Sequence, residues 1–199
     1  GMGKTLRMKK LFHAPFTLRK TLLDLIAREA SNADAGQPAR IIIKVNALTD
    51  ARMIKALYKA SQAGVEIDLI VRGMCCLRPG IAGVSHNIQV RSIIGQFLEH
   101  SRVFYFLNSG ADEELLLSSA KWKERNRDKR SETCYPFEGK KMLKKNKKEL
   151  LTYLKDNTHA WLLQSDGSYQ QLQPTAEQQD CHAQAQLLEQ LSIPLIKVS

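Results

Sequence analysis

The stretch "RIIIKVNALTDARMIKALYKASQAGVEIDLIVRG", which runs from Arg40 to Gly73, predicts the centre of the fold. Its β-branched start, residues 40–48, is typical of a buried strand, and residues 65–71 supply a second strand. Between them, Asp50 can cap a helix that continues through residue 61. A strand, a helix and a strand with short connections form a right-handed unit, so we expect two parallel strands in an α/β fold.

The rest of the chain alternates between helical and strand patterns in the same way. The expected elements are a helix at 17–30, short strands at 88–91, 102–107, 114–117 and 132–135, a helix at 142–154, a hairpin that turns at Asp166 and Gly167, and a helix at 175–191. Because short strands accompany the parallel pair, the predicted fold is α/β with a mixed sheet flanked by helices.

Size and charge limit the classes of function. The chain has 199 residues, 43% of them hydrophobic and 25% charged, which suits one domain with short appendages. Its net charge of +10 favours an anionic partner, which can be nucleic acid, a membrane surface or a phosphate-rich compound. No apolar run is long enough to span a bilayer, and four cysteines without a CxxC pair fit a cytoplasmic protein with reduced thiols.

Basic and polar side chains follow the two central strands where each of them ends. Lys44 and Asn46 end the first strand, Arg72 follows the second, and Arg78 lies in the "CLRPG" turn just after it. Active groups of open α/β sheets gather at the carboxyl ends of strands. These four side chains are therefore expected to converge as a cationic pocket for phosphate oxygens, the alternative being ordinary solvated charges.

A second basic feature is the tract "GKKMLKKNKKELL", which holds six lysines between Lys140 and Lys148. On a helix, Met142, Leu143 and Leu150 would face inward and the lysines outward. Such a face is either simply solvated or a docking stripe for a polyanion. The other basic tract, "KWKERNRDKR", has no apolar period and is predicted to be a loop, with Trp122 as its anchor.

The sequence "EHSR" offers a candidate for catalysis. The whole chain lacks a Walker loop, a GxGxxG motif, an HExxH motif and a nucleophile elbow, and it shows no metal-ligand spacing. His100 and Arg102 stand two residues apart before an apolar strand, so their side chains are expected on one face. A histidine beside a cation suits phosphate chemistry, because imidazole can attack or protonate while the cation balances charge.

Five segments carry a resemblance to a known family: "APFTLRKTLLDLIARE", "ASQAGVEIDLIVRGMCCLRPG", "NIQVRSIIGQFLEHSRVFYF", "SSAKWKERN" and "LQSDGSYQQL". They resemble the C-terminal catalytic part of bacterial polyphosphate kinases, which move phosphate between ATP and polyphosphate. The resemblance implies a phospholipase-D-like half-domain over residues 14–173, with a tail at 1–13 and a C-terminal helix and tail at 174–199. It also implies ATP and polyphosphate as partners.

Individual residues match the family's motifs. In phospholipase-D-like enzymes two half-domains each contribute a histidine to one site; one is phosphorylated, and the other acts as acid/base or holds the transferred phosphate. His100 matches that second histidine, and Arg102 matches the basic residue after it. The resemblance further implies phosphate or nucleotide contacts from Arg72, from the pair Ser118 and Ser119, and from the pair Arg125 and Asn126.

The chain departs from the family in two ways. Only the second half-domain is present, so the phosphorylated histidine and the magnesium ligands are expected in a separate first half. In addition, Lys121 stands where the family pattern has an aspartate, which would change the charge balance beside the site. The alternative function is therefore a catalytically inactive polyphosphate- or polyanion-binding module. Nucleic acid is a weaker alternative, because the aromatic residues are not interleaved with the basic ones.

The resemblance also implies a mode of assembly. Single-motif members of the phospholipase D superfamily complete a site by pairing two chains, and here His100 would be brought to a shared cleft. Cationic pockets repel one another across such an axis, so we expect a weak dimer strengthened by phosphate, or a monomer.

Overall fold

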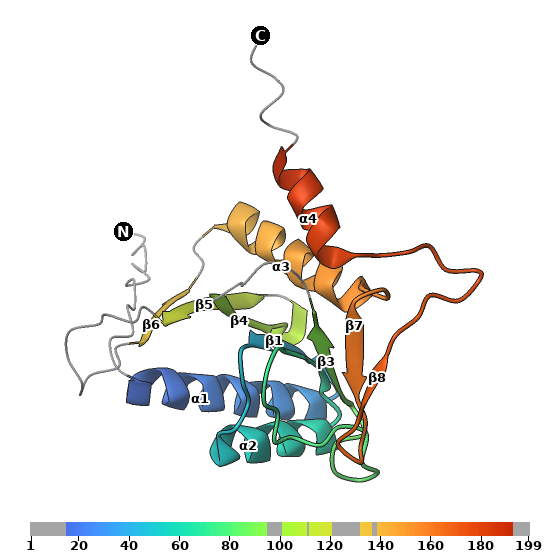
Figure 1. The fold of residues 1–199 in the computed structure, drawn as a ribbon. Helices are drawn as coiled ribbons and strands as arrows, with labels where there is room; N and C mark the ends of the chain where they lie inside the picture. The colour runs from blue at the N-terminus through green and yellow to red at the C-terminus, as the bar shows by residue number, and fades with distance from the viewer. Residues whose placement is uncertain (1–14, 95–100, 111, 121–131, 137–138, 193–199) are drawn as a thin grey trace, which may run out of the picture.

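A computed structural model describes residues 15–94, 101–110, 112–120, 132–136 and 139–192 (Figure 1). Its core is one eight-stranded mixed sheet with the strand order β6-β5-β4-β1-β2-β3-β7-β8. The strands are β1 (Arg40–Val45), β2 (Glu66–Val71), β3 (Ile88–Ile93), β4 (Ser101–Phe106), β5 (Glu114–Ala120), β6 (Glu132–Pro136), β7 (Ala160–Leu163) and β8 (Tyr169–Gln171). The predicted α/β fold class and the hairpin at Asp166-Gly167 are confirmed.

The central strand–helix–strand unit forms as its sequence predicts. β1 and β2 are parallel, with Ile41 opposite Ile67 and Val45 opposite Val71. Between them lies α2 (Ala51–Gln62), and the carboxylate of Asp50 accepts hydrogen bonds from the first backbone amides of this helix. These bonds satisfy donors that a helix start otherwise leaves without partners.

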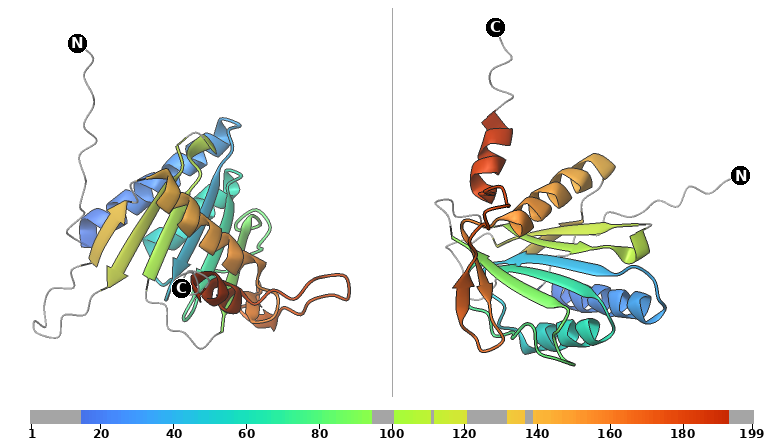
Figure 2. Two further views of the ribbon diagram at one scale, coloured as in Figure 1. Left: turned by 90° about the horizontal axis from the view of Figure 1, so that it is seen from above. Right: turned by 90° about the vertical axis from the view of Figure 1, so that its right-hand side faces the viewer.

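Helices cover both faces of the sheet (Figures 1 and 2). α1 (Pro15–Asp34) and α2 pack on one face, while α3 (Lys140–Lys155) crosses the other. The alternation of β1 shows the division, because Ile41 and Ile43 belong to the core under α1 and α2, and Ile42 belongs to the core under α3. None of the helices in the described ranges is long and apolar enough to cross a bilayer.

α3 corrects two details of the predicted inner face. Leu150 is buried as expected, but Met142 is 46% exposed because it lies in the first turn, short of the apolar core. Lys147 does not point into solvent with the other lysines. Its ammonium group forms an ion pair with Glu113 and lies 5.3 Å from the centre of the Tyr105 ring. One of the six lysines therefore fastens the helix to the sheet.

The last helix, α4 (Ala183–Ser192), starts later than predicted. The expected start at Thr175 is wrong because the buried carboxylate of Asp156 accepts a hydrogen bond from the amide of Ala183 at 2.8 Å and so fixes the first turn there. The segment before it is held in a non-helical path by Asn157, which bonds to the backbone of Gln179 and Cys181.

The topology gives the sheet two chemically different edges. β1, β2 and β3 are parallel, and β4 and β7 run against them, so the ends of β1, β2, β3 and β5 and the starts of β4 and β7 lie together. We call this side the carboxyl edge. The opposite side, which holds Arg40, Asp68, Glu114 and the turn between β7 and β8, is the amino edge.

Candidate functional site

Three adjacent strands each bring one cationic side chain to the carboxyl edge. β4, β1 and β2 are neighbours in the sheet, and they contribute Arg102, Lys44 and, directly after β2, Arg72. Arginine and lysine side chains are the protein groups best suited to bind phosphate oxygens. The predicted gathering of Lys44, Asn46 and Arg72 at one edge is therefore present, and Arg102 joins it from the neighbouring antiparallel strand.

The backbone around Arg72 is fixed between two strands. The Arg72 amide donates to the carbonyl of Val45 at 3.3 Å, and the Gly73 amide donates to the carbonyl of Asn46 at 2.8 Å. On the other side, the hydroxyl of Ser92 donates to the Arg72 carbonyl at 3.3 Å. A Cβ atom on Gly73 would lie 3.0 Å from the Asn46 carbonyl oxygen, so this close approach favours glycine. The exposed Arg72 side chain thus extends from a well-anchored turn.

Lys44 lies on the face covered by α3. Its ammonium nitrogen is 4.5 Å from the centre of the Tyr153 ring, within the range of a cation–π interaction. Tyr153 is itself buried, at 4% exposure, so the ring holds the lysine at the end of β1. The sequence analysis did not single out Tyr153. Its only signal was helical spacing, which equally fits a residue that does no more than pack.

Arg102 lies on the opposite face of the sheet, next to Ser118. The two residues are directly paired across β4 and β5, so their side chains are neighbours on one face. Phe104, two residues after Arg102, belongs to the core under α1 and α2, which identifies that face. Ser118 is 1% exposed, and its hydroxyl has no hydrogen-bond partner among the described residues. Such a buried hydroxyl beside a guanidinium can accept or donate one further bond.

The amino edge holds ion pairs between arginines and carboxylates. Arg40 contacts Asp68 at 2.9 Å, and Arg28 contacts Glu114 at 2.9 Å. These pairs neutralise charge on that side. At the carboxyl edge, Arg72 has an exposed side chain that an anion can reach.

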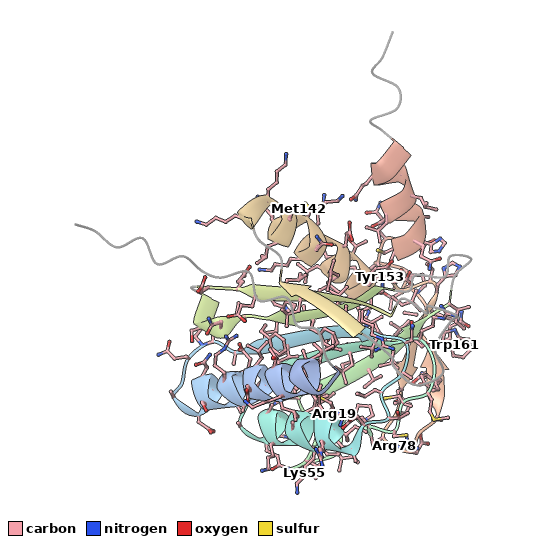
Figure 3. The ribbon with its side chains drawn as sticks, turned by 90° about the vertical axis from the view of Figure 1, so that its left-hand side faces the viewer. Arg19, Lys55, Arg78, Met142, Tyr153 and Trp161 are labelled. Carbon is pink, nitrogen blue, oxygen red and sulfur yellow. The ribbon has the colours of Figure 1, made fainter. Side chains whose placement is uncertain are left out.

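Arg78 does not join the other predicted phosphate ligands. The chain after Arg72 runs along α2 to the amino edge, where the Arg78 amide donates to the hydroxyl of Tyr58 at 2.9 Å. The guanidinium packs against Gly167 in the β7–β8 turn, where an added Cβ would lie 2.8 Å from one of its nitrogens. Figure 3 shows Arg78 on the α2 side, below Trp161. The expected convergence fails for this residue because "CLRPG" continues away from the strand end.

Several predicted site residues lie outside the described part of the chain. They are His100, Lys121, Trp122, Arg125 and Asn126, and the side chain of Ser119 belongs with them. The backbone of Ser119 pairs with Ser101 at the carboxyl edge. The roles that the resemblance implies for these residues remain predictions.

The described residues at this edge suit phosphate better than a metal ion. Magnesium prefers oxygen ligands, above all carboxylates. Within the described ranges, no group of three histidine, cysteine, aspartate or glutamate side chains is placed to hold a metal. The donors that do gather at the edge are cationic, so we assign no magnesium ligand to them.

Comparison with known proteins gives one consistent family. A sequence model of the polyphosphate kinase C-terminal domain 2 family matches residues 11–184. Polyphosphate kinase of Pseudomonas aeruginosa is 69% identical over 196 residues, which cover 98% of this chain and 28% of that protein. Polyphosphate kinase of Pseudomonas syringae is also 69% identical, over 198 residues that cover 100% of this chain and 27% of that protein. The chain thus spans less than a third of these relatives.

Solved structures agree with the fold. Polyphosphate kinase from Porphyromonas gingivalis superposes with a TM-score of 0.83 at 35% identity, covering 96% of this chain and 29% of that one. Nuc from Salmonella typhimurium, a phospholipase D family member, gives a TM-score of 0.50 at 15% identity, covering 81% of this chain and 97% of that one. The second likeness concerns the fold alone, and it agrees with the expected phospholipase-D-like half-domain.

Proposed function

Because this chain belongs to the polyphosphate kinase C-terminal domain 2 family, we propose that it forms the second half of a site that transfers phosphate between ATP and polyphosphate. The observation that carries this proposal is the cationic carboxyl edge, to which β1, β2 and β4 bring Lys44, Arg72 and Arg102. Phosphoryl transfer depends mainly on positioning and on balancing the negative charge of the transferred group, which fixed cations supply.

The reaction moves one phosphoryl group. The bond between the β,γ-bridging oxygen and the γ-phosphorus of ATP breaks and leaves ADP, and a new P–O bond forms to the terminal oxygen of the polyphosphate chain. Our proposal gives Arg72 to the nucleotide phosphates and Arg102 to the phosphoryl group in transfer. His100 either moves a proton or holds the phosphate in passing, as its match to the family's second histidine suggests.

The proposed site needs a second contributor. Relatives are more than three times as long as this chain. The resemblance implies that the phosphorylated histidine and the magnesium ligands lie in a first half-domain. A separate first half, or a second copy of this chain in a weak dimer, would supply the missing side of the cleft. Free thiols at Cys75, Cys76 and Cys181 are consistent with a protein that functions in the bacterial cytoplasm.

A second candidate function is polyanion binding without turnover. It is favoured by Lys121 in place of the family's aspartate and by the exposed lysines of α3. The two functions differ in one measurable respect, because a binding module holds polyphosphate but forms no ADP from ATP.

The test of the proposed function is the substitution Arg72→Gln. We expect ATP to bind about 10- to 100-fold more weakly, the size of a lost charge-assisted hydrogen bond to phosphate. Titration calorimetry of the 199-residue chain measures this change. Lys59→Gln serves as the control, since it removes one positive charge from the end of α2 near the amino edge. Equal losses in the two variants would show that only net charge matters and would overturn the site.

A further inference from the structure

α3 carries an unused set of cations along its outer surface. Lys141, Lys144, Lys148 and Lys155 are all exposed, and their spacing of three, four and seven residues places them on one side of the helix. Lys140 and Lys145, also exposed, flank this line. Figure 3 shows nitrogen-tipped side chains extending from α3 away from the sheet. We refer to Lys141, Lys144, Lys148 and Lys155 as the lysine stripe.

The stripe is not used for folding contacts that the structure describes. Its four ammonium groups form no ion pair or side-chain hydrogen bond with any residue in the described ranges. Lys147 in the same tract provides the contrast, because it is turned toward the sheet and paired with Glu113. Lysines that stabilise the fold and lysines that remain available are therefore separated on two sides of one helix.

The stripe leads to the carboxyl edge. α3 packs over β2, and Tyr153 near its end contacts Lys44 at the end of β1. From Tyr153 back to Lys141 the helix covers 12 residues, a run of about 18 Å at 1.5 Å per residue. The lysine stripe thus follows the outside of α3 from the end near the cationic edge, interrupted at the buried Thr152, and it is longer than a triphosphate can follow.

We propose that the lysine stripe binds the polyphosphate chain as it extends from the carboxyl edge, so that α3 guides the polymer while its end reacts. This inference rests on the proposed function and adds the surface on which the long substrate lies. The occupant is a linear polymer of phosphates, because the stripe offers a line of exposed positive charges along the helix. Single-stranded nucleic acid would need exposed aromatic rings for its bases, and Tyr153, the aromatic residue of α3, is buried.

The experiment compares two matched pairs of substitutions. Lys144→Gln with Lys148→Gln removes two charges one turn apart from the stripe, while Lys55→Gln with Lys59→Gln removes two charges one turn apart from α2. Figure 3 places Lys55 on the face of the sheet opposite α3. Glutamine has nearly the helix propensity of lysine, so both helices should stay intact. Binding of long-chain polyphosphate, of tripolyphosphate and of ATP is measured over a range of salt concentrations.

The stripe variant should bind long-chain polyphosphate about tenfold more weakly, and its salt slope should fall by about 1.4, that is ~0.7 for each lost contact on a single strand. Tripolyphosphate and ATP should bind it as they bind the wild type, and the α2 variant should match the wild type throughout. Equal weakening in both variants would overturn the proposal, as would equally tight binding of oligo-deoxythymidine in a competition.

The outcomes also separate this inference from the proposed function. If Arg72→Gln weakens ATP binding but the stripe variant binds long polyphosphate normally, the proposal for the stripe is wrong and the proposed site at the carboxyl edge stands. If the folded wild-type chain binds neither ATP nor polyphosphate, both proposals are wrong.

Discussion

Substitution of His100 by alanine should remove phosphoryl transfer while leaving polyphosphate bound nearly as tightly as before. The imidazole is proposed to act on the phosphoryl group itself, whereas the polymer is held by cations that remain in place. Loss of a catalytic acid or base costs on the order of 10²- to 10⁴-fold in rate. The assay uses a chimera in which this chain replaces the matching C-terminal segment of Pseudomonas aeruginosa polyphosphate kinase, so that a first half-domain is present.

The control for this result is His86→Ala. His86 is an exposed histidine beside the amino edge and should be irrelevant to transfer. Formation of ADP from labelled ATP and growth of polyphosphate are followed for both variants. A His100→Ala chimera that retains the unsubstituted rate would remove this residue from the mechanism, and an equal loss in the His86 variant would indicate a general defect of the fold.

The second large effect concerns stability. Asp156 is 1% exposed, and its carboxylate accepts hydrogen bonds from the amides of Thr158, His159 and Ala183 at 3.1, 2.7 and 2.8 Å. It also provides negative charge near the buried Arg91, whose pKa is lowered by burial, an effect partly opposed by Asp68 and Asp156. Asp156→Ala leaves one buried and two partly buried amide donors without an acceptor and should lower the free energy of unfolding by about 3 kcal/mol.

Asp166→Ala is the matched control for this substitution. Asp166 also accepts hydrogen bonds, from the amide and the hydroxyl of Ser168, but it is exposed in the β7–β8 turn, where water replaces a lost partner. Urea denaturation should show a much smaller change for this variant. If the two substitutions prove equally mild, the Asp156 carboxylate does not join α4 to the end of α3 as described.

Much of the fold could be predicted because local and tertiary signals agree. In the segment from Arg40 to Gly73, β-branched strands, a capping aspartate and an amphipathic helix all indicate one arrangement, and that arrangement forms. The prediction for the last helix failed because its start depends on Asp156, which lies 27 residues earlier in the sequence. Met142 was expected to face inward and is exposed, whereas Lys147 was expected to face outward and points to the sheet. The sequence did not show that Glu113 lies opposite Lys147.

The positions of some site residues could likewise be predicted from the sequence, and those of others could not. The carboxyl-edge position of Lys44, Asn46 and Arg72 comes from strand direction, which the pattern of the chain predicts. Arg78 was misplaced because a turn that begins at this edge was assumed to stay there, whereas its chain continues along α2 to Tyr58. The pairing of Arg102 with Ser118 required the order of β4 and β5 in the sheet, which periodicity does not give.

The central claim is that the carboxyl edge is the phosphate-binding side of this half-domain. Backbone amide chemical shifts of the 199-residue chain, recorded while ATP and then polyphosphate are added, test it most directly. The account predicts that the shifts of Asn46, Arg72, Gly73 and Arg102 change, while those of Arg40, Asp68 and Glu114 at the amino edge stay constant. Changes that concentrate at the amino edge, with Arg72 and Arg102 unaffected, would contradict it.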